Sequence, residues 1–331
     1  ACGITCAAIE MAAAGDIGID IDLDSIPLRE IPMTQNITAA AAGRFTFPGT
    51  GLSVNRMGYG AMQLAGPHVF GEPKDPEEAR ATLREAVALG VDHFDTSDFY
   101  GPYVTNRLIR ETLSPYPEEL TLVTKIGAWR DDKGNWILDS SPDFLRKSVE
   151  DNLENLRLER MSIVNLRLEG PEVDIVPPMR AMRRMQEEGL IDHIGISTVD
   201  MAQVETARNI APVVCVQNLY NLANRGDDGM IDRLAEDGIA YVPYFPLGGF
   251  TPLQSDALSE VAAEIGRSAQ SVALAWLLQR SPNILVILTD DQGYADISLN
   301  PRHPEEVSTP HMDALAADGV VFSQGYGNAE A

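Results

Sequence analysis

The chain reads Phe94-Asp95-Thr96-Ser97-Asp98-Phe99-Tyr100-Gly101, and 25 residues after Tyr100 it reaches Lys125 in the run Leu122-Val123-Thr124-Lys125-Ile126-Gly127. An acid, a phenol and an amine near the ends of neighbouring apolar runs are the groups that together donate a proton when a carbonyl group is reduced. A tyrosine hydroxyl titrates near pH ~10, so it donates slowly at neutral pH unless a neighbouring cation favours its ionised form. We expect Lys125 to supply this cation and Asp95 to hold the lysine charged and in place.

The spacing of these residues fits two neighbouring parallel strands. Asp95 and Tyr100 are five residues apart, so Asp95 can close a strand while Tyr100 opens the loop after it. Lys125 ends the next apolar run, which begins at Leu120, and would lie beside Asp95 if the two strands are adjacent. Because Asp-x-x-x-x-Tyr is a common pattern by itself, the interpretation depends on the architecture around it.

The surrounding sequence alternates short apolar runs with helical patterns. The apolar runs begin near Asn55, Val91, Leu120, Ser162, Ile191, Val213, Ile239 and Asn283. Helical periodicity is clearest in Pro76 to Leu89, Pro142 to Leu156, Val176 to Glu188 and Ala269 to Gln279. Eight strands alternating with helices over about 235 residues predict an α/β fold, the (β/α)8 TIM barrel.

A doubly wound sheet is the main alternative to a barrel. Such a sheet carries Gly-x-Gly-x-x-Gly after its first strand, whereas this chain has Gly58-Tyr59-Gly60-Ala61-Met62, without the third glycine. Polar residues also collect where a barrel has its active site, at the C-terminal ends of the strands. These residues are Asp95, Lys125, Arg167, Ser197, Gln217 and Tyr244.

Over about residues 45–287 the chain resembles the aldo-keto reductases, and within them the pyridoxal reductase (pyridoxine 4-dehydrogenase) branch. The resemblance is carried by the stretches Gly58 to Pro67, Asp95 to Tyr103, Val104 to Asn106, Val164 to Arg167, Val214 to Asn218 and Ala240 to Gln254. It implies a TIM barrel that reduces an aldehyde to an alcohol by hydride transfer from NADPH. NADH is the alternative cofactor. Pyridoxal to pyridoxine is the reaction that the resemblance favours.

The resemblance also implies roles for the strand ends and the loops beside them. The catalytic set is Asp95, Tyr100, Lys125 and Arg167, in which Tyr100 is the general acid, Lys125 lowers its pKa and Asp95 pairs with Lys125. The cofactor-binding set is Gly60, Met62, Ser197, Gln217, Tyr244, Leu247 and Gly249, in which Ser197 and Gln217 hold the nicotinamide carboxamide and Tyr244 stacks on the ring. Without the family, a Ser or Gln at a strand end is more often a local cap, and such a Tyr is more often a core residue.

Arg167 departs from the pattern of most aldo-keto reductases, which have a histidine at the end of the fourth strand. The same replacement is a feature of the pyridoxal-reductase-like branch, so it is compatible with activity. A guanidinium group is always charged, so Arg167 cannot act as a neutral acid, but it can orient a carbonyl or phenolate oxygen. Pyridoxal has such an oxygen beside its aldehyde. The alternative is that Arg167 makes only a structural ion pair in the barrel mouth.

The N-terminal part of the chain, residues 1–43, is interpreted as an extension of unknown role that precedes the barrel at residues 44–288. Met33 is where a member of the family would begin, so the first 32 residues are expected to be an appended segment. Cys2 and Cys6 have no His or further Cys nearby, and we therefore expect no metal site.

The C-terminal part, residues 282–331, resembles the N-terminal fragment of a sulfatase, in which paired aspartates after the first strand bind calcium. The matching stretches are Leu288 to Asp296, Thr309 to Ala316 and Gly319 to Phe322. Aldo-keto reductases carry here a Gly-Thr-Ser-Ser loop and a helix start that bind the 2′-phosphate and adenine of NADPH. We therefore predict that a foreign segment, residues 289–331, replaces the end of the barrel. Ile284 to Leu288 can still form the eighth strand, and Thr309 to Ala317 can supply the last covering helix.

This replacement leaves other functions open. Asp290 and Asp291 do not suit NADPH, because two carboxylates repel the 2′-phosphate that the family binds at this position. One alternative is a catalytically impaired or non-functional chimera that retains at most ligand binding, and another is a barrel that binds nicotinamide or an aldehyde without turnover. A sulfatase is disfavoured, because no Cys-x-Pro-x-Arg or Ser-x-Pro-x-Arg nucleophile motif occurs before Ala331.

The formal charge of −24 excludes several classes of partner. Six acids against Arg29 give residues 1–32 a charge of −5, and eight acids against Arg302 give residues 289–331 a charge of −7, which together are half of the total. Nucleic acids and anionic membranes need positive charge and are poor partners for such a chain. No apolar run reaches the ~18 residues of a membrane span, and no signal peptide is evident. Three cysteines in 331 residues indicate a reducing compartment, so we expect a cytoplasmic protein. The resemblance to the aldo-keto reductases implies a small-molecule aldehyde as substrate, and we expect a monomer or weak oligomer.

Overall fold

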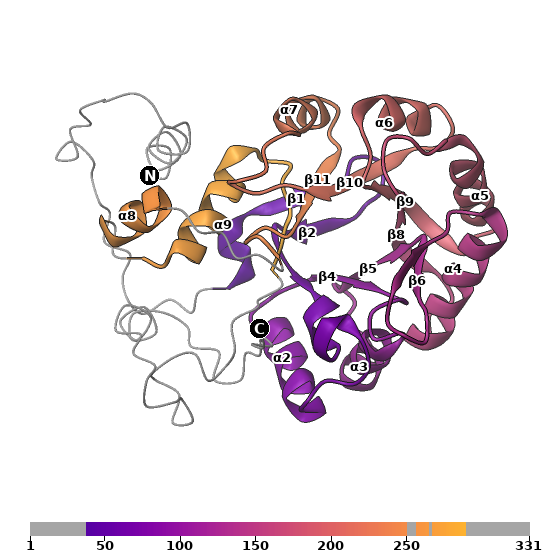
Figure 1. The fold of residues 1–331 in the computed structure, drawn as a ribbon, viewed down its shortest axis with the longest axis horizontal. Coiled ribbons are helices and arrows are strands. Elements are labelled where there is room, and N and C mark those ends of the chain that lie inside the picture. Colours follow the sequence, from indigo (N-terminus) through magenta and orange to yellow (C-terminus); the bar gives the residue numbers. More distant parts are fainter. Residues whose placement is uncertain (1–37, 250–255, 265–266, 289–331) are drawn as a thin grey trace.

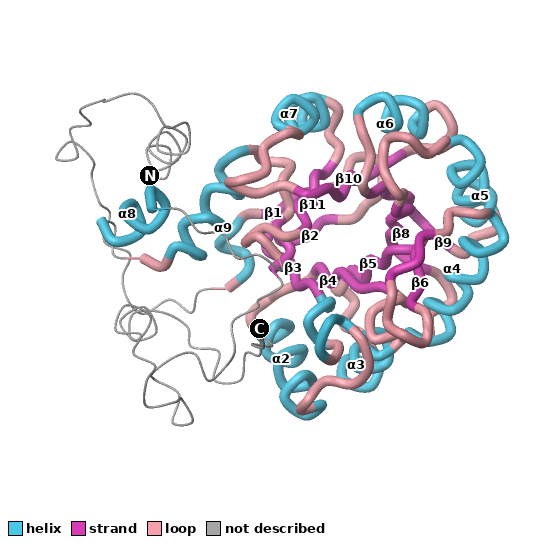
Figure 2. Tube along the Cα trace, in the orientation of Figure 1, coloured by secondary structure: helices cyan, strands magenta, loops and turns pink. Residues whose placement is uncertain are grey.

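The computed structural model describes residues 38–249, 256–264 and 267–288, in which eight parallel strands form a ring with helices on its outside (Figure 1 and Figure 2). The strands are β3 (Met57–Gly60), β4 (His93–Ser97), β5 (Thr121–Ile126), β8 (Met161–Arg167), β9 (Ile191–Ser197), β10 (Val213–Leu219), β11 (Ala240–Tyr244) and β12 (Val286–Leu288). Hydrogen bonds connect them in the order β11-β10-β9-β8-β5-β4-β3-β12. The predicted (β/α)8 barrel is therefore confirmed.

The helices of the described residues are α2 (Pro76–Ala88), α3 (Val104–Leu113), α4 (Pro142–Leu156), α5 (Val176–Glu187), α6 (Met201–Arg208), α7 (Asp228–Glu236), α8 (Asp256–Glu264) and α9 (Ala269–Arg280). Four of them, α2, α4, α5 and α9, agree closely with the predicted ones. The start of α2 shows the local signals by which a helix can be predicted from the sequence. The side chain of Asp75 accepts hydrogen bonds from the N–H groups of Glu77 and Glu78 at 3.0 and 3.1 Å, and Pro76 follows at a position where no N–H is needed.

The barrel closes through its last described strand. On one side β12 pairs with β3, and Val286 lies opposite Met57. On the other side a single bridge, between Tyr241 and Ile284, joins β11 to the segment just before β12. There the N–H of Tyr241 donates to the carbonyl of Asn283 and the N–H of Leu285 donates to the carbonyl of Tyr241, both at 2.9 Å. The eighth strand, expected from Ile284 to Leu288, is thus present but shorter, over Val286–Leu288.

Several predicted features lie outside the described residues. They are most of the N-terminal extension with Cys2 and Cys6, the segment 289–331 with Asp290 and Asp291, and the proposed covering helix from Thr309 to Ala317. The predictions made for these segments from the sequence therefore remain predictions.

The first barrel strand begins later than predicted. The apolar run near Asn55 divides in two, because β2 (Ser53–Asn55) pairs antiparallel with β1 (Arg44–Thr46) and the barrel strand starts only at Met57. Arg56 separates the two strands. Its guanidinium donates to the carbonyl oxygens of Leu278, Ser281 and Ile284 at 2.6, 2.7 and 3.0 Å, which ties this end of the barrel to the closing strand.

The β1–β2 hairpin closes the N-terminal end of the ring. Phe47 and Val54 are buried there and pack against side chains that point into the barrel from the strands. These partners are Val123, Ile163, Cys215, Ala240, Val242, Leu285 and Ile287. A larger apolar cluster fills the space between the ring and its helices. With this end closed by apolar side chains, the polar strand ends collect at the opposite, C-terminal end.

One glycine lets polar side chains cross the barrel interior. Asn165 on β8 and Cys215 on β10 meet across β9, where the Cys215 thiol lies 3.1 Å from Asn165 Oδ1. A Cβ atom at Gly195, which stands between them, would overlap both Asn165 Oδ1 and Cys215 Sγ. Gly195 is therefore required for close packing rather than for backbone conformation.

We expect Gly195→Ala to lower the free energy of unfolding by ~1–3 kcal/mol, because overpacking a filled barrel interior forces its neighbours to move. Chemical denaturation measures this change. Gly229→Ala is the matched control: Gly229 lies exposed on α7 with nothing within 4 Å of its Cβ position, so the substitution is expected to be neutral or mildly stabilising. An unchanged stability of Gly195→Ala would contradict the packing argument.

Candidate active site

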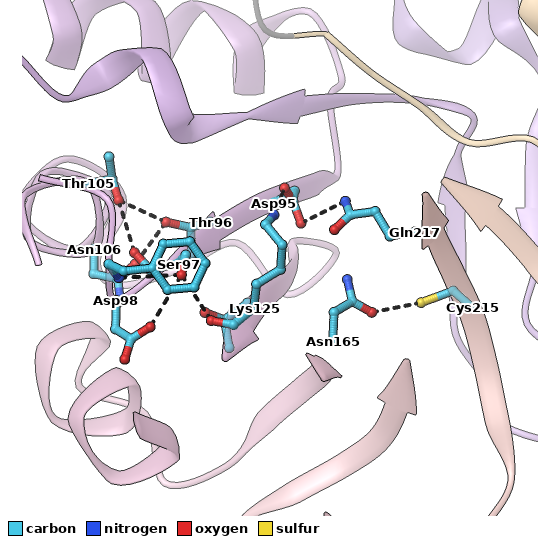
Figure 3. A network of polar contacts seen from close by, with 12 residues as sticks. Asp95, Thr96, Ser97, Asp98, Thr105, Asn106, Lys125, Asn165, Cys215 and Gln217 are labelled. Carbon is cyan, nitrogen blue, oxygen red and sulfur yellow. Dashed lines mark hydrogen bonds and ion pairs between the residues drawn. The ribbon is translucent and has the colours of Figure 1, made fainter. Parts of the chain in front are cut away.

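Asp95 and Lys125 form a buried ion pair at the C-terminal ends of β4 and β5. The two strands are parallel neighbours, as the spacing predicted, and both side chains are at most 7% exposed. Lys125 Nζ donates to Asp95 Oδ2, and Gln217 Nε2 donates to Asp95 Oδ1 at 3.3 Å from the other side of the ring (Figure 3). Asp95 is therefore held between β5 and β10, and Lys125 keeps its charge away from bulk water.

Tyr100 lies in the turn directly after β4 and is 5% exposed. Lys125 Nζ is 5.3 Å from the centroid of its ring. Burial raises the pKa of Tyr100, and the charge of Lys125 opposes this without cancelling it, so the net pKa lies above the ordinary value. Lys125 thus acts in the expected direction, but burial is the larger effect. At neutral pH the phenol therefore carries its proton, which is the state that a general acid requires.

Lys125 remains an ammonium group despite its burial. Burial alone would lower the pKa of Lys125, but the negative charge of Asp95 and the contact with Tyr100 raise it, and the net pKa lies above the ordinary value. The arrangement therefore places a permanent cation beside a neutral phenol. Such a cation favours a phenolate if the phenol gives up its proton.

Arg167 ends β8, and its guanidinium carbon lies 6.0 Å from the centroid of the Tyr244 ring. No carboxylate of the described residues lies within ion-pair distance of this guanidinium. The structural ion pair that was the alternative for Arg167 is thus not found in this part of the chain. Gly127 brings β5 close to this strand end, since a Cβ atom there would overlap the Arg167 carbonyl oxygen.

The expected carboxamide-binding residues carry unused hydrogen-bonding atoms. Ser197 Oγ and Gln217 Oε1 are buried and have no hydrogen-bond partner among the described residues. Buried polar atoms without a partner are costly, so such a pair indicates a site for a polar ligand. A primary carboxamide, with two N–H donors and one carbonyl acceptor, fits a hydroxyl beside an amide oxygen. Tyr244 ends β11 at the same end of the barrel.

The other expected cofactor residues lie in the segments after β3 and β11. Gly60 ends β3, and Met62 packs against the small apolar cluster that contains Tyr100. Leu247 packs instead against the helix-facing core, and Gly249, with φ 67°, lies against the Phe245 ring so closely that a Cβ atom would overlap it. The structure thus brings Met62 to Tyr100 and places Leu247 and Gly249 together in the segment after β11.

Thr198 was missed by the sequence reasoning. It follows Ser197 directly, adopts a left-handed φ of 61° and has a buried hydroxyl without a partner among the described residues. Left-handed backbone is rare for a β-branched residue and is concentrated at functional sites. A threonine after a strand carries no sequence signal of this conformation, so only the structure could reveal it.

Asp98 was also missed, although it lies within the opening motif (Figure 3). Burial raises the pKa of Asp98 to about 7, against the lowering effect of hydrogen bonds from Ser148 and Ser97. Ser97 has a single hydroxyl proton, which it can donate to the Lys125 carbonyl at 2.9 Å. The same hydroxyl also lies 3.2 Å from Asp98 Oδ1, to which it can donate instead. The buried Asp98 carboxyl group is thus held by the hydroxyl groups of Ser97 and Ser148.

Apolar side chains surround the mouth of the site. The large hydrophobic residues that are exposed in the described part of the chain are Tyr103, Trp129, Trp136, Leu138 and Leu219, all at C-terminal strand ends or in the segments after them. We call these five residues the apolar rim. Three of them lie on the hairpin of β6 (Ala128–Arg130) and β7 (Trp136–Leu138), which follows β5 and was not predicted. The turn residues Asp131 to Gly134 between two Trp-containing runs were its available signal.

Comparison with known proteins agrees with this architecture. The sequence profile described as Aldo/keto reductase family matches residues 56–290, and the profile described as Sulfatase matches residues 282–331. Pyridoxine 4-dehydrogenase of Escherichia coli (strain K12) is 60% identical over 241 residues, which are 71% of this chain and 84% of that protein.

Solved structures show the same fold. A glycerol dehydrogenase from Gluconobacter oxydans superposes with a TM-score of 0.66 at 19% identity, covering 84% of this chain and 95% of that one. An aldo-keto reductase from Klebsiella pneumoniae in complex with NADPH superposes with a TM-score of 0.60 at 20% identity, covering 73% of this chain and 83% of that one.

Proposed function

This chain belongs to the aldo/keto reductase family and is an oxidoreductase, and from that premise we propose that it reduces an aldehyde with NADPH, converting pyridoxal to pyridoxine. The observation that carries the proposal is the buried Asp95–Lys125 pair beside a protonated Tyr100 at the C-terminal end of the barrel. The unpartnered atoms of Ser197 and Gln217 at the same end of the barrel support a nicotinamide cofactor.

When bound, NADPH would supply a hydride for the carbonyl carbon of the substrate. Tyr100 donates its hydroxyl proton to the carbonyl oxygen, which becomes the alcohol. The phenolate left on Tyr100 is stabilised by the ammonium group of Lys125, and Asp95 keeps that group charged and oriented. Water then returns a proton to Tyr100. Ser197 and Gln217 would hold the carboxamide of the cofactor, and Tyr244 would stack on its ring.

Pyridoxal is the proposed substrate for three reasons. The E. coli relative is named for pyridoxine, the alcohol that this reaction forms. The apolar rim offers aromatic surfaces to a flat ring, with Trp129 and Trp136 at 42% and 44% exposure. Arg167 has no carboxylate partner among the described residues, so its donors remain for the oxygen beside the aldehyde.

Activity with the full chain tests the proposal. Fluorescence titration with NADPH and NADH measures cofactor binding, and loss of NADPH absorbance in the presence of pyridoxal measures turnover. Reduction of pyridoxal supports the proposal. Binding of NADPH with no turnover of any aldehyde would support instead a barrel that binds without catalysis.

The second candidate function is that of a catalytically impaired chimera of an aldo-keto reductase and a sulfatase fragment, and one observation favours it. The sulfatase profile begins at residue 282, inside the closing region of the barrel, and overlaps the reductase profile over residues 282–290. A chain joined there has Asp290 and Asp291 where the family binds the 2′-phosphate, as expected for an impaired chimera.

Arg167→Leu is expected to raise the KM for pyridoxal by ~10-fold, since it removes a charge-assisted hydrogen bond of ~1.5 kcal/mol. An aldehyde without a neighbouring oxygen, such as benzaldehyde, is the matched control, and its KM should change by less than ~2-fold. Steady-state kinetics with both substrates measure the two values. Equal increases for both substrates would show that Arg167 does not recognise the oxygen of pyridoxal.

The proposed setting is a cytoplasmic enzyme with a small-molecule substrate, a monomer or weak oligomer. The acidic composition and the few cysteines support it. None of the helices that the structure describes is long and apolar enough to cross a membrane.

A further inference from the structure

Arg130, on β6, is a buried arginine whose donors are used on backbone carbonyl groups. It is 7% exposed, and its guanidinium lies 4.0 Å from the centroid of the Trp136 ring. It donates to the carbonyl oxygens of Val69 and His68 at 2.9 and 3.0 Å, and twice to that of Gly134 at 3.0 and 2.7 Å. The contacts with Gly134 stay within the β6–β7 hairpin, whereas those with His68 and Val69 reach a separate loop.

That loop, residues 66–71, has an unusual backbone. His68 and Val69 both adopt left-handed conformations, with φ of 60° and 59°. This region is rare for non-glycine residues and is a clear outlier for a β-branched valine. Such a conformation persists only when surrounding contacts impose it. The two carbonyl groups that Arg130 binds belong to these two strained residues.

The 66–71 loop in turn holds the turn that carries Tyr100. The carbonyl of Val69 accepts a second hydrogen bond, from the N–H of Gly101 at 3.2 Å, and the N–H of Gly71 donates to the carbonyl of Gly101 at 2.9 Å. The side chains of Val69, Phe99 and Tyr100 pack in one buried cluster. The carbonyl oxygen of Val69 thus connects the Arg130 guanidinium to Gly101, the residue that follows Tyr100.

We propose that Arg130 is a positioning residue for Tyr100, which it fixes through the carbonyl of Val69 and the strained 66–71 loop. The planar guanidinium is suited to this task, because it binds carbonyls of two different segments at once. A lysine has one nitrogen and cannot make the same set of contacts. The catalytic consequence rests on the proposed function, whereas the placement of the Tyr100 ring does not.

Fluorine NMR of protein labelled with 3-fluorotyrosine tests the placement without any need for activity. The chain has nine tyrosines, and the Tyr100 resonance is the one lost in Tyr100→Phe. In Arg130→Met this resonance should shift or broaden, and Arg130→Lys should do the same if the methionine variant does not fold. An unmoved Tyr100 resonance in the folded variant overturns the proposal.

Arg56→Met is the matched control. Arg56 also binds three backbone carbonyl groups through its guanidinium, but at the opposite end of the barrel. It should lower thermal stability comparably and leave the Tyr100 resonance in place. If Arg56→Met moves the resonance as much as Arg130→Met does, the effect is one of general stability and the proposal fails.

Kinetics test whether Arg130 acts through Tyr100. Arg130→Met should lower kcat for pyridoxal at least ~10-fold while the KM for NADPH changes less than ~2-fold. In a Tyr100→Phe background, the same substitution should cost less than ~2-fold, because residues that act as a unit are not additive. Losses that multiply would show an independent role and overturn the proposal. If the resonance moves but neither Tyr100→Phe nor Arg130→Met changes turnover, the proposed proton donor is wrong and the positioning of the ring stands.

Discussion

Tyr100→Phe will keep the fold and lower the turnover of pyridoxal by ~10²–10⁴-fold, the usual loss when a general acid is removed. The substitution deletes one hydroxyl and leaves the ring, so the buried contacts with Phe99 and Val69 are kept. The remaining rate would depend on water as the proton source. Steady-state rates of NADPH oxidation measure the loss, and circular dichroism confirms the fold.

The matched control for this variant is Tyr116→Phe. This substitution also removes a hydroxyl group that has a hydrogen-bond partner, since the OH of Tyr116 donates to the carbonyl of Leu156 at 2.8 Å. Leu156 is the last residue of α4, so Tyr116 lies away from the barrel mouth. Its turnover should stay within ~2-fold of the parent. If Tyr100→Phe reduces pyridoxal as fast as the parent does, Tyr100 is not the proton donor.

Restoring the family's Gly-Thr-Ser-Ser loop and following helix after Ile287 should strengthen NADPH binding by at least ~100-fold, because it returns two or three charge-assisted hydrogen bonds at ~1.5–3 kcal/mol each. The present sequence has Thr289, Asp290 and Asp291 at this position. NADH lacks the 2′-phosphate and should gain less, so the preference for NADPH should widen. Fluorescence titration of both cofactors measures the change.

A second variant separates repulsion from missing donors. Replacing Asp290 and Asp291 by Ala removes the two negative charges without supplying any donor. It should recover only a small part of the ~100-fold difference, because the missing contacts are the larger effect. If the restored loop does not improve the affinity for NADPH, the replaced segment does not limit this chain.

The strands were predictable because parallel barrel strands are buried on both faces and appear as continuous apolar runs. Ile191 and Val213 begin strands at the predicted residues, and α4 spans the predicted Pro142 to Leu156. The first strand was misplaced because two apolar runs meet at Arg56, and nothing local to the sequence assigns one run to the hairpin and the other to the barrel. That assignment depends on carbonyl groups more than 200 residues away, at 222 to 228 positions from Arg56.

The candidate site was predictable where its residues are distinguished by type and spacing. Asp95 and Lys125 lie on neighbouring strands and are offset by two residues, with Asp95 opposite Val123 and Lys125 opposite Ser97, so spacing was sufficient to bring them together. Arg130 and Thr198 could not be found in this way. Arg130 acts on backbone carbonyl groups, which have the same chemistry in every residue, and Thr198 is distinguished by its backbone angle rather than by its type.

The closing strand β12 has a consequence for how the nascent chain folds. Ile284, just before this strand, is made 228 residues after Arg56, to which it is bound, and protein synthesis over that length takes roughly 10 to 45 s. During this interval the seven earlier strands can assemble, but β3 and β11 each present an unpaired edge. Such edges are templates for pairing with another chain. We therefore expect the incomplete barrel to be more prone to aggregation than the barrel closed by β12.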